Sequence, residues 1–195
     1  MLLYALLIIF FIVVVILYYK HVSYAKWHSK PLHNFPFIYK GKKFWYSRSV
    51  AVAHIVLGWN NDNQLCVLAN KRGKGTPDSQ GLWNCPCGYL DFDESGVEAA
   101  QRETFEETEL YIKKENIHFF DVNSSPTANR QNVTIHYYSE LEGHCEDYKL
   151  SSEHSEFNEV EEIKWIPIEE VDNYSWAFHH NDLIKRIINN IKNNR

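Results

Sequence analysis

The chain has 195 residues, of which 45% are hydrophobic, 15% aromatic and 23% charged, and its formal net charge is -5. This apolar content suffices for a folded core, so the composition excludes wholesale disorder, and the length suits one globular domain with an extension. The negative charge argues against a strongly basic nucleic-acid binder, and no DNA partner is expected.

The N-terminus carries an apolar run, LLYALLIIFFIVVVILYY over residues 2–19, without a charge or a proline. At about 1.5 Å per residue a helix of this length nearly crosses a bilayer. Lysines follow the run and none precedes it, which predicts a single-pass anchor over residues 1–19, with lipid around residues 2–19 and the rest of the chain in the cytoplasm. A signal peptide cleaved after Ala25 and a buried core helix are the alternatives.

Residues 20–46 are rich in histidine, lysine and aromatic side chains, as expected of a juxtamembrane connector. A folded domain is predicted over residues 47–195. Its first apolar segments, 49–57 and 64–70, flank a polar turn cluster and indicate a β-hairpin. The basic loop 71–75 that follows either approaches phosphate groups or is a solvated turn.

The cysteines are Cys66, Cys85, Cys87 and Cys145, and only Cys85 and Cys87 are close in sequence. No second pair completes a zinc site, and a chain of this length and apolar content does not need disulfides for stability. Reduced cysteines are therefore expected.

The most informative segment is rich in acidic residues. Ser95 and Glu98 have the spacing of a capping box, and good helix formers follow, which predicts a helix over residues 96–109. The helical spacing i, i+3 and i+4 of Glu103, Glu106 and Glu107 predicts that three carboxylates converge on one face.

Like charges at this spacing repel, and no lysine lies at helical spacing within the segment to relieve them. A solvated acidic face is the ordinary explanation of such a helix, but it fits this repulsion poorly. The expected partner is Mg²⁺, with Mn²⁺ as the alternative, because these hard cations prefer oxygen ligands.

The same segment resembles the Nudix box, G-x5-E-x7-R-E-U-x-E-E-x-G-U, in which U is a bulky apolar residue. The matching positions are Gly88, Glu94, Arg102, Glu103, Glu106, Glu107 and the final apolar residue Leu110. The chain departs from the pattern at Thr104, where an apolar residue is usual, and at Glu109, where glycine is usual. Since glycine lets a helix end in a left-handed turn, Glu109 implies a local rearrangement.

The resemblance implies an α/β fold, the Nudix α/β/α sandwich with a mixed β-sheet, here with one N-terminal transmembrane helix in addition. Further strands are expected at 117–122, 132–141 and 162–166. An amphipathic helix is expected near the C-terminus, with an apolar stripe formed by Leu183, Ile184, Ile187, Ile188 and Ile191.

The activity that the resemblance implies is Mg²⁺-dependent hydrolysis of a nucleoside diphosphate linked to another moiety, with ADP-ribose-like compounds or nucleoside triphosphates as candidate substrates. The metal ligands would be Glu103, Glu106 and Glu107, joined by the backbone carbonyl of Cys87. Arg102 would orient these carboxylates through charge-assisted hydrogen bonds.

Gly88 and Glu94 would hold the loop and the helix of the box together. A general base must take the proton of the attacking water. In the family this base is a box glutamate or an acid from a later loop, where Glu156 and Glu159 are preferred because they immediately precede a strand. A solvated acidic loop is the alternative for most of that region.

Two other functions stay open. One is a catalytically silent Nudix-like sensor that binds a nucleotide at a membrane, and the other is a membrane-tethered interaction module. The substrate, the general base and the oligomeric state are not determined by the sequence, and a homodimer is one option.

Overall fold

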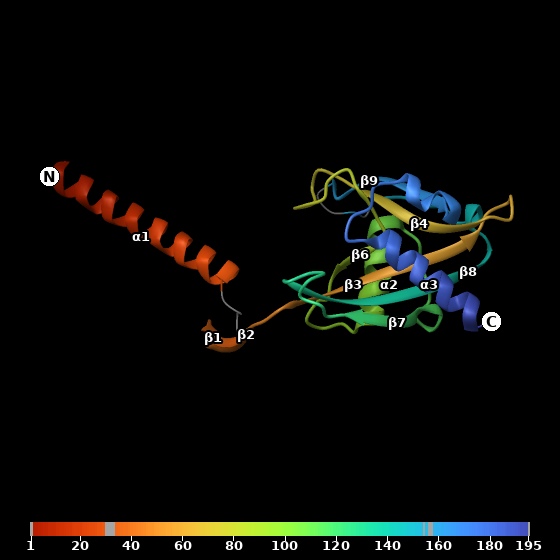
Figure 1. Cartoon of the computed structure of the whole chain (residues 1–195), viewed down its shortest axis with the longest axis horizontal. Helices are drawn as coiled ribbons and strands as arrows, with labels where there is room; N and C mark the ends of the chain where they lie inside the picture. The colour runs from red at the N-terminus through yellow and green to blue at the C-terminus, as the bar shows by residue number, and fades with distance from the viewer. Residues whose placement is uncertain (1, 30–33, 154, 156–157, 195) are drawn as a thin grey trace. The chain divides into compact units, whose positions relative to one another are not determined.

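The computed structural model in Figure 1 describes residues 2–29, 34–153, 155 and 158–194. The chain divides into two compact units, Met1–Ser47 and Arg48–Arg195.

The first unit begins with helix α1, Leu2–Ser29, which includes the whole apolar run. Across the residues that the structure describes, no helix combines the length and the apolar character needed to cross a membrane. The transmembrane helix predicted over residues 1–19, and the lipid contact that depended on it, are therefore not supported.

A β-hairpin completes this unit. Strand β1, Phe35–Tyr39, pairs antiparallel with β2, Lys42–Tyr46. The two residues between them, Lys40 and Gly41, both have positive φ angles, 47° and 75°, as a two-residue hairpin turn of this type requires. The predicted connector 20–46 thus contains regular structure.

The second unit is built on a mixed sheet that has seven strands in the described part of the chain. Neighbours follow the order β5-β4-β3-β8-β7, while β6 pairs with β3 and β9 pairs with β4. Strands β3 and β8 are parallel and the other pairs are antiparallel. The strands are β3 Ser49–Trp59, β4 Leu65–Arg72, β5 Trp83–Asn84, β6 Cys87–Tyr89, β7 His118–Asn123, β8 Asn132–His144 and β9 Val160–Pro167. The mixed sheet, the first hairpin and the later strands are confirmed.

Two longer helices, α2 (Gly96–Thr108) and α3 (His180–Asn194), cover opposite faces of this sheet (Figure 1). Short 3-10 turns lie at Lys114–Asn116 (η1), Cys145–Asp147 (η2) and Ile168–Asn173 (η4). The alternation of strand β3 explains the layers, because successive side chains point to opposite faces. Ile55 and Leu57 pack toward α3, whereas Val52 and Val56 pack toward α2.

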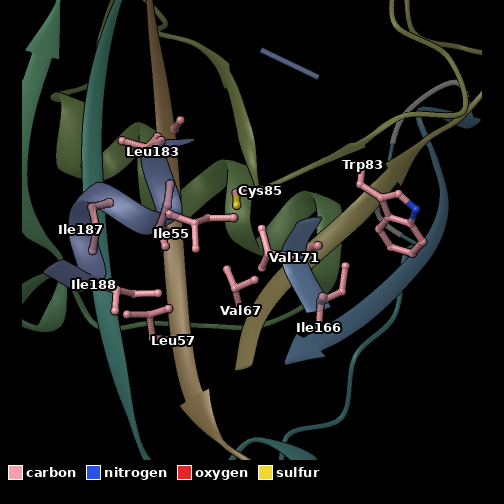
Figure 2. Packing of buried hydrophobic residues seen from close by; sticks show 13 residues of the cluster. Ile55, Leu57, Val67, Trp83, Cys85, Ile166, Val171, Leu183, Ile187 and Ile188 are labelled. Atoms are coloured by element: carbon pink, nitrogen blue, oxygen red, sulfur yellow. The ribbon is translucent and has the colours of Figure 1, made fainter. Parts of the chain in front are cut away.

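The layer under α3 is wholly apolar at its centre. Figure 2 shows Leu183 and Ile188 of α3 close to the strand that carries Ile55 and Leu57, and Ile187 belongs to the same apolar cluster. The predicted stripe is confirmed, since its first four members are buried and Ile191 packs against the cluster. This apolar layer covers one face of the sheet, and α2 covers the other face.

Candidate active site

Helix α2 begins with the predicted capping box. The backbone N–H of Ser95 donates to Glu98 Oε2 at 2.8 Å, and the Glu98 N–H donates to Ser95 Oγ at 3.4 Å. These bonds satisfy donors that a helix N-terminus leaves free, and so they fix the residue at which α2 starts.

The end of α2 corrects one expectation. Glu109 was expected to force a local rearrangement, but it takes the left-handed conformation itself, with φ 56° and ψ 10°. Its N–H donates to the Phe105 carbonyl at 2.7 Å, as in an ordinary left-handed helix end. The glutamate therefore preserves the turn of the box and carries the backbone strain that glycine avoids.

Arg102 is the centre of a network of carboxylates. Its guanidinium donates to Glu94 at 2.6 and 3.0 Å, to Glu103 at 2.7 Å and to Glu106 at 2.9 Å. A further bond to the Tyr89 carbonyl, at 3.0 Å, ties the helix to β6. We expected a cation to relieve the repulsion between Glu103, Glu106 and Glu107. Arg102 already relieves part of it, because its guanidinium pairs with Glu103 and Glu106.

Glu107 differs from the other box acids because it is buried against the sheet. Only 8% of its surface is exposed, and its Oε2 accepts hydrogen bonds from Asn70 Nδ2 at 3.1 Å and the Cys87 N–H at 3.2 Å. Burial raises the pKa of Glu107 well above its ordinary value, and the charge of Glu103 raises it further. Burial also raises the pKa of Glu103, to about 7, although Arg102 opposes that shift.

A glycine, Gly88, stands at the turn that faces these acids. A Cβ added at Gly88 would overlap the carboxylate of Glu103, so the box glycine allows the helix and β6 to approach each other closely.

The His54 N–H of β3 bonds to the Pro86 carbonyl at 2.9 Å. In an antiparallel strand, neighbouring residues point their N–H and C=O groups to opposite sides. Cys87, the residue after Pro86, therefore points its N–H and its carbonyl away from β3, to the side where its N–H bonds to Glu107.

The three carboxylates predicted as metal ligands make different contacts in the structure, and their role as ligands stays a prediction. Among the described residues, no group of three His, Cys, Asp or Glu side chains is gathered closely enough to hold a metal ion. The reason lies in the pairings above, because Glu106 reaches toward Arg102 whereas Glu107 is turned into the protein.

The candidate general bases have different outcomes. Glu156 lies outside the described residues. Glu159 lies next to the loop after β4, where its carbonyl accepts the Gly73 N–H at 2.7 Å. Its charge contributes to the raised pKa of Glu107, which puts Glu159 within electrostatic range of the box.

Two residues at the end of β4 lie close to the box acids. Asn70 was not predicted, and Arg72, the last residue of β4, was named only as part of the basic loop 71–75. Asn70 is buried and holds Glu107, and Arg72 lowers the pKa of Glu107 through its charge. Arg72 also donates to the Asp78 carbonyl at 3.1 Å and stacks its guanidinium 4.8 Å from the ring centre of Phe178. The alternation of the predicted strand 64–70 could have indicated Asn70, since it shares the face of Leu68.

The fold and the site together define a class: a mixed sheet between two helices, one of which presents acids around a single arginine beside a glycine turn. The family profile of the NUDIX domain matches residues 48–187. The chain therefore belongs to the Nudix family.

Solved structures with the same fold support this assignment. The NUDIX domain of Shewanella oneidensis NrtR, complexed with ADP ribose, has 22% identity and a TM-score of 0.64, covering 75% of this chain and 90% of that one. A MutT/nudix family protein from Enterococcus faecalis has 20% identity and a TM-score of 0.61, covering 87% and 69%. A Francisella tularensis bifunctional NMN adenylyltransferase/ADP ribose pyrophosphatase, complexed with AMP and a Mn ion, has 19% identity and a TM-score of 0.57, covering 74% and 42%.

Proposed function

We propose that this protein hydrolyses the diphosphate bond of a nucleoside diphosphate linked to another moiety, in a reaction that depends on Mg²⁺ or Mn²⁺. The observation that carries the proposal is the pair Glu103 and Glu107, two carboxyl groups held beside the Cys87–Gly88 turn with pKa values raised by burial. Groups of this kind cluster at functional sites.

The donor set fits a hard divalent cation. Glu103, Glu106 and Glu107 offer carboxylate oxygens and Cys87 offers a carbonyl oxygen, which are the ligand types that Mg²⁺ and Mn²⁺ prefer. Arg102 bonds to Glu94, Glu103 and Glu106, whereas Glu107 has the charge of Arg72, which leaves its pKa raised. A bound cation would add to that charge and stabilise the ionised form of this buried carboxyl group. When bound, the cation would neutralise charge on the phosphate oxygens and lower the pKa of the attacking water.

The protein's own side chains have separate tasks in this proposal. Arg102 and Glu94 hold Glu103 and Glu106 in place, while Asn70 holds Glu107. Glu159 is the preferred general base because the Gly73 contact keeps its segment near the box. Glu156 is the second candidate on the sequence pattern alone.

The substrate class follows from the family and its relatives. An ADP-ribose complex exists for the Shewanella domain, and an ADP ribose pyrophosphatase is part of the Francisella protein. ADP-ribose is therefore the first compound to test, ahead of nucleoside triphosphates.

The test is a hydrolysis screen of the full-length protein with ADP-ribose, dinucleoside polyphosphates, nucleotide sugars and oxidised deoxynucleoside triphosphates. Turnover is expected with Mg²⁺ or Mn²⁺ and not in chelator. Glu106→Gln and Glu107→Gln should each lower kcat by about a hundredfold or more, by analogy with other groups that stabilise developing charge. Glu115→Gln, a change at an exposed glutamate of η1, is the control. Uniform inactivity would contradict the proposal.

A nucleotide sensor without hydrolytic activity is the second candidate. It is favoured by the likeness to Shewanella oneidensis NrtR, whose NUDIX domain is solved in complex with ADP ribose and which is also solved in complex with a 27mer DNA. Melting curves with ADP-ribose, followed by analysis of the ADP-ribose, separate the two functions. A sensor would be stabilised by ADP-ribose in the presence of chelator, and the ADP-ribose would stay intact when Mg²⁺ is added.

A further inference from the structure

A buried histidine lies between the sheet and the helix that carries the box. His54 of β3 has no exposed surface, and its two ring nitrogens lie 2.8 Å from Thr104 Oγ1 of α2 and 2.8 Å from Ser139 Oγ of β8. Thr104 and Ser139 are also fully buried. The ring therefore bridges the box helix and the strand parallel to its own.

The protonation state of the ring matches the two hydroxyls. Burial lowers the pKa of His54 to about 3, so the imidazole is neutral at physiological pH, with one nitrogen that donates and one that accepts. One hydroxyl thus donates a hydrogen bond to the ring, and the other accepts one from the ring N–H. Thr104 Oγ1 also lies 2.7 Å from Ala100 O, and Ser139 Oγ lies 2.6 Å from Asn116 O. Because each hydroxyl has a single hydrogen, the hydroxyl that accepts from the ring is the one that donates to its carbonyl.

This network explains why threonine stands at a position of the box that is usually apolar. A hydroxyl buried against a sheet needs a polar partner, and His54 supplies one. The same histidine bonds through its backbone N–H to the Pro86 carbonyl, one residue before Cys87. One residue of β3 therefore holds both parts of the box, the turn through its main chain and the helix through its side chain.

We propose that His54 is a positioning residue that sets α2 against the Cys87–Gly88 turn, and that it does so through Thr104 and Ser139. The proposal rests on the metal-dependent function given above. Thr104 directly follows Glu103, so a rotation of α2 about its axis moves the Glu103 carboxylate relative to the turn. The Glu103 carboxylate lies directly against Gly88, where an added Cβ would overlap it, so its place depends on the spacing of α2 and β6. The His54 bridge acts on this spacing together with the bonds of Arg102 to Tyr89 and of Cys87 to Glu107.

The decisive variants are Thr104→Val, which keeps the shape and removes the hydroxyl, and Ser139→Ala, which touches no residue of the box. Both should weaken Mg²⁺ binding by about tenfold in the full-length protein, the lower end of the range for residues that bond directly to a metal ligand, because these two act on the ligands only through the position of α2. Binding is measured with Mg²⁺ alone from the rise in melting temperature. Both variants should lower kcat by a similar factor and leave KM within about twofold. Thr104→Ser restores the hydroxyl and should restore both quantities.

The matched control is Thr108→Val. Thr108 is equally buried on the same helix and donates to the Thr104 carbonyl at 2.6 Å, but it makes no bond to His54. It should lose stability as Thr104→Val does and keep the Mg²⁺ affinity and kcat of the wild type. Wild-type Mg²⁺ affinity in Thr104→Val, or an equal loss in Thr108→Val, would overturn the positioning role.

Hydrogen exchange separates this inference from the proposed function. If the wild type neither binds Mg²⁺ nor hydrolyses any compound, the proposed function fails. Hydrogen exchange of the α2 amides then decides whether the bridge holds the helix. Ser139 lies on β8, so faster exchange of α2 amides in Ser139→Ala would show that the bridge links the two elements. Unchanged exchange would refute the bridge itself.

Discussion

Arg102 shows how one side chain can organise several acids at the residue scale. Its guanidinium has donors enough to bind Glu94, Glu103 and Glu106 at once, whereas a lysine offers a single point charge. The exposed fraction of the side chain is 28% for Arg102, 13% for Glu94 and 14% for Glu103, so solvent screens these charges only partly. Glu107, by contrast, is held by neutral donors.

The raised pKa of Glu103 predicts a dependence of stability on pH. The folded protein holds the proton of this carboxyl group up to a pKa of about 7, whereas the unfolded chain releases it near 4.5. Between pH 4.5 and about 7 the folded protein therefore binds more protons than the unfolded chain. The stability that this extra proton contributes is present below pH 4.5 and is lost as the pH rises to about 7. In chelator, the free energy of unfolding of the wild type should fall across this window relative to Glu103→Gln, by about 3 kcal/mol at most. Parallel pH profiles for the two proteins would show that the shift is absent.

The left-handed Glu109 predicts a stabilising substitution. Glu109→Gly places the residue that the box usually has at φ 56°, which glycine adopts without strain. The free energy of unfolding should rise by about 1 kcal/mol, measured by urea titration. A loss of stability would mean that contacts of the glutamate side chain outweigh the backbone strain.

Sequence patterns found the residues of the box but not their geometry. The positions of Arg102, Glu103, Glu106 and Glu107 followed from their spacing. That Glu107 turns inward depends on Asn70 and Cys87, which lie on other strands. Spacing along one helix carries no information about such partners, and His54 is hidden for the same reason.

Helix α2 is the element on which the site depends, and its start is fixed by side chains outside the catalytic set. Ser95→Ala removes one half of the capping box, so the protein should lose about 1 kcal/mol of stability in thermal or urea unfolding. The kcat of the folded protein should stay within about twofold of the wild type, because the Ser95 side chain bonds to Glu98, which is not one of the box acids. A large fall in kcat without a loss of stability would assign Ser95 a direct role.

Periodicity predicted the elements well where the chain alternates or repeats regularly. The hairpin of β3 and β4, the helix start at Ser95 and the stripe of α3 are examples. The hairpin at Phe35–Tyr46 was not expected, because its residues are mostly exposed on both faces and give no alternation of apolar and polar side chains. The pairing of β8 with β3 in parallel joins segments far apart in the sequence, which local patterns do not specify.

For the molecule as a whole, we expect a divalent cation to stabilise the folded protein. In the proposed function Mg²⁺ would bind the folded arrangement of Glu103, Glu106 and Glu107 and not the unfolded chain, and so it would shift the equilibrium toward the folded state. At about tenfold above its Kd the gain is roughly 1.4 kcal/mol, which corresponds to a rise in melting temperature of a few degrees for a chain of this size. Glu107→Gln should reduce this rise, and Na⁺ at matched ionic strength should not reproduce it. A rise of equal size in Glu107→Gln would place the cation elsewhere.

The most direct test of diphosphate hydrolysis is turnover in H₂¹⁸O with Mg²⁺, using the compound of the screen that reacts fastest and analysing the products by mass spectrometry. Attack of water on phosphorus predicts two phosphorylated products, one of which carries a single ¹⁸O atom on its phosphate, and almost no turnover with Glu107→Gln. Label recovered outside the phosphate groups, or equal turnover by wild type and Glu107→Gln, would contradict the account.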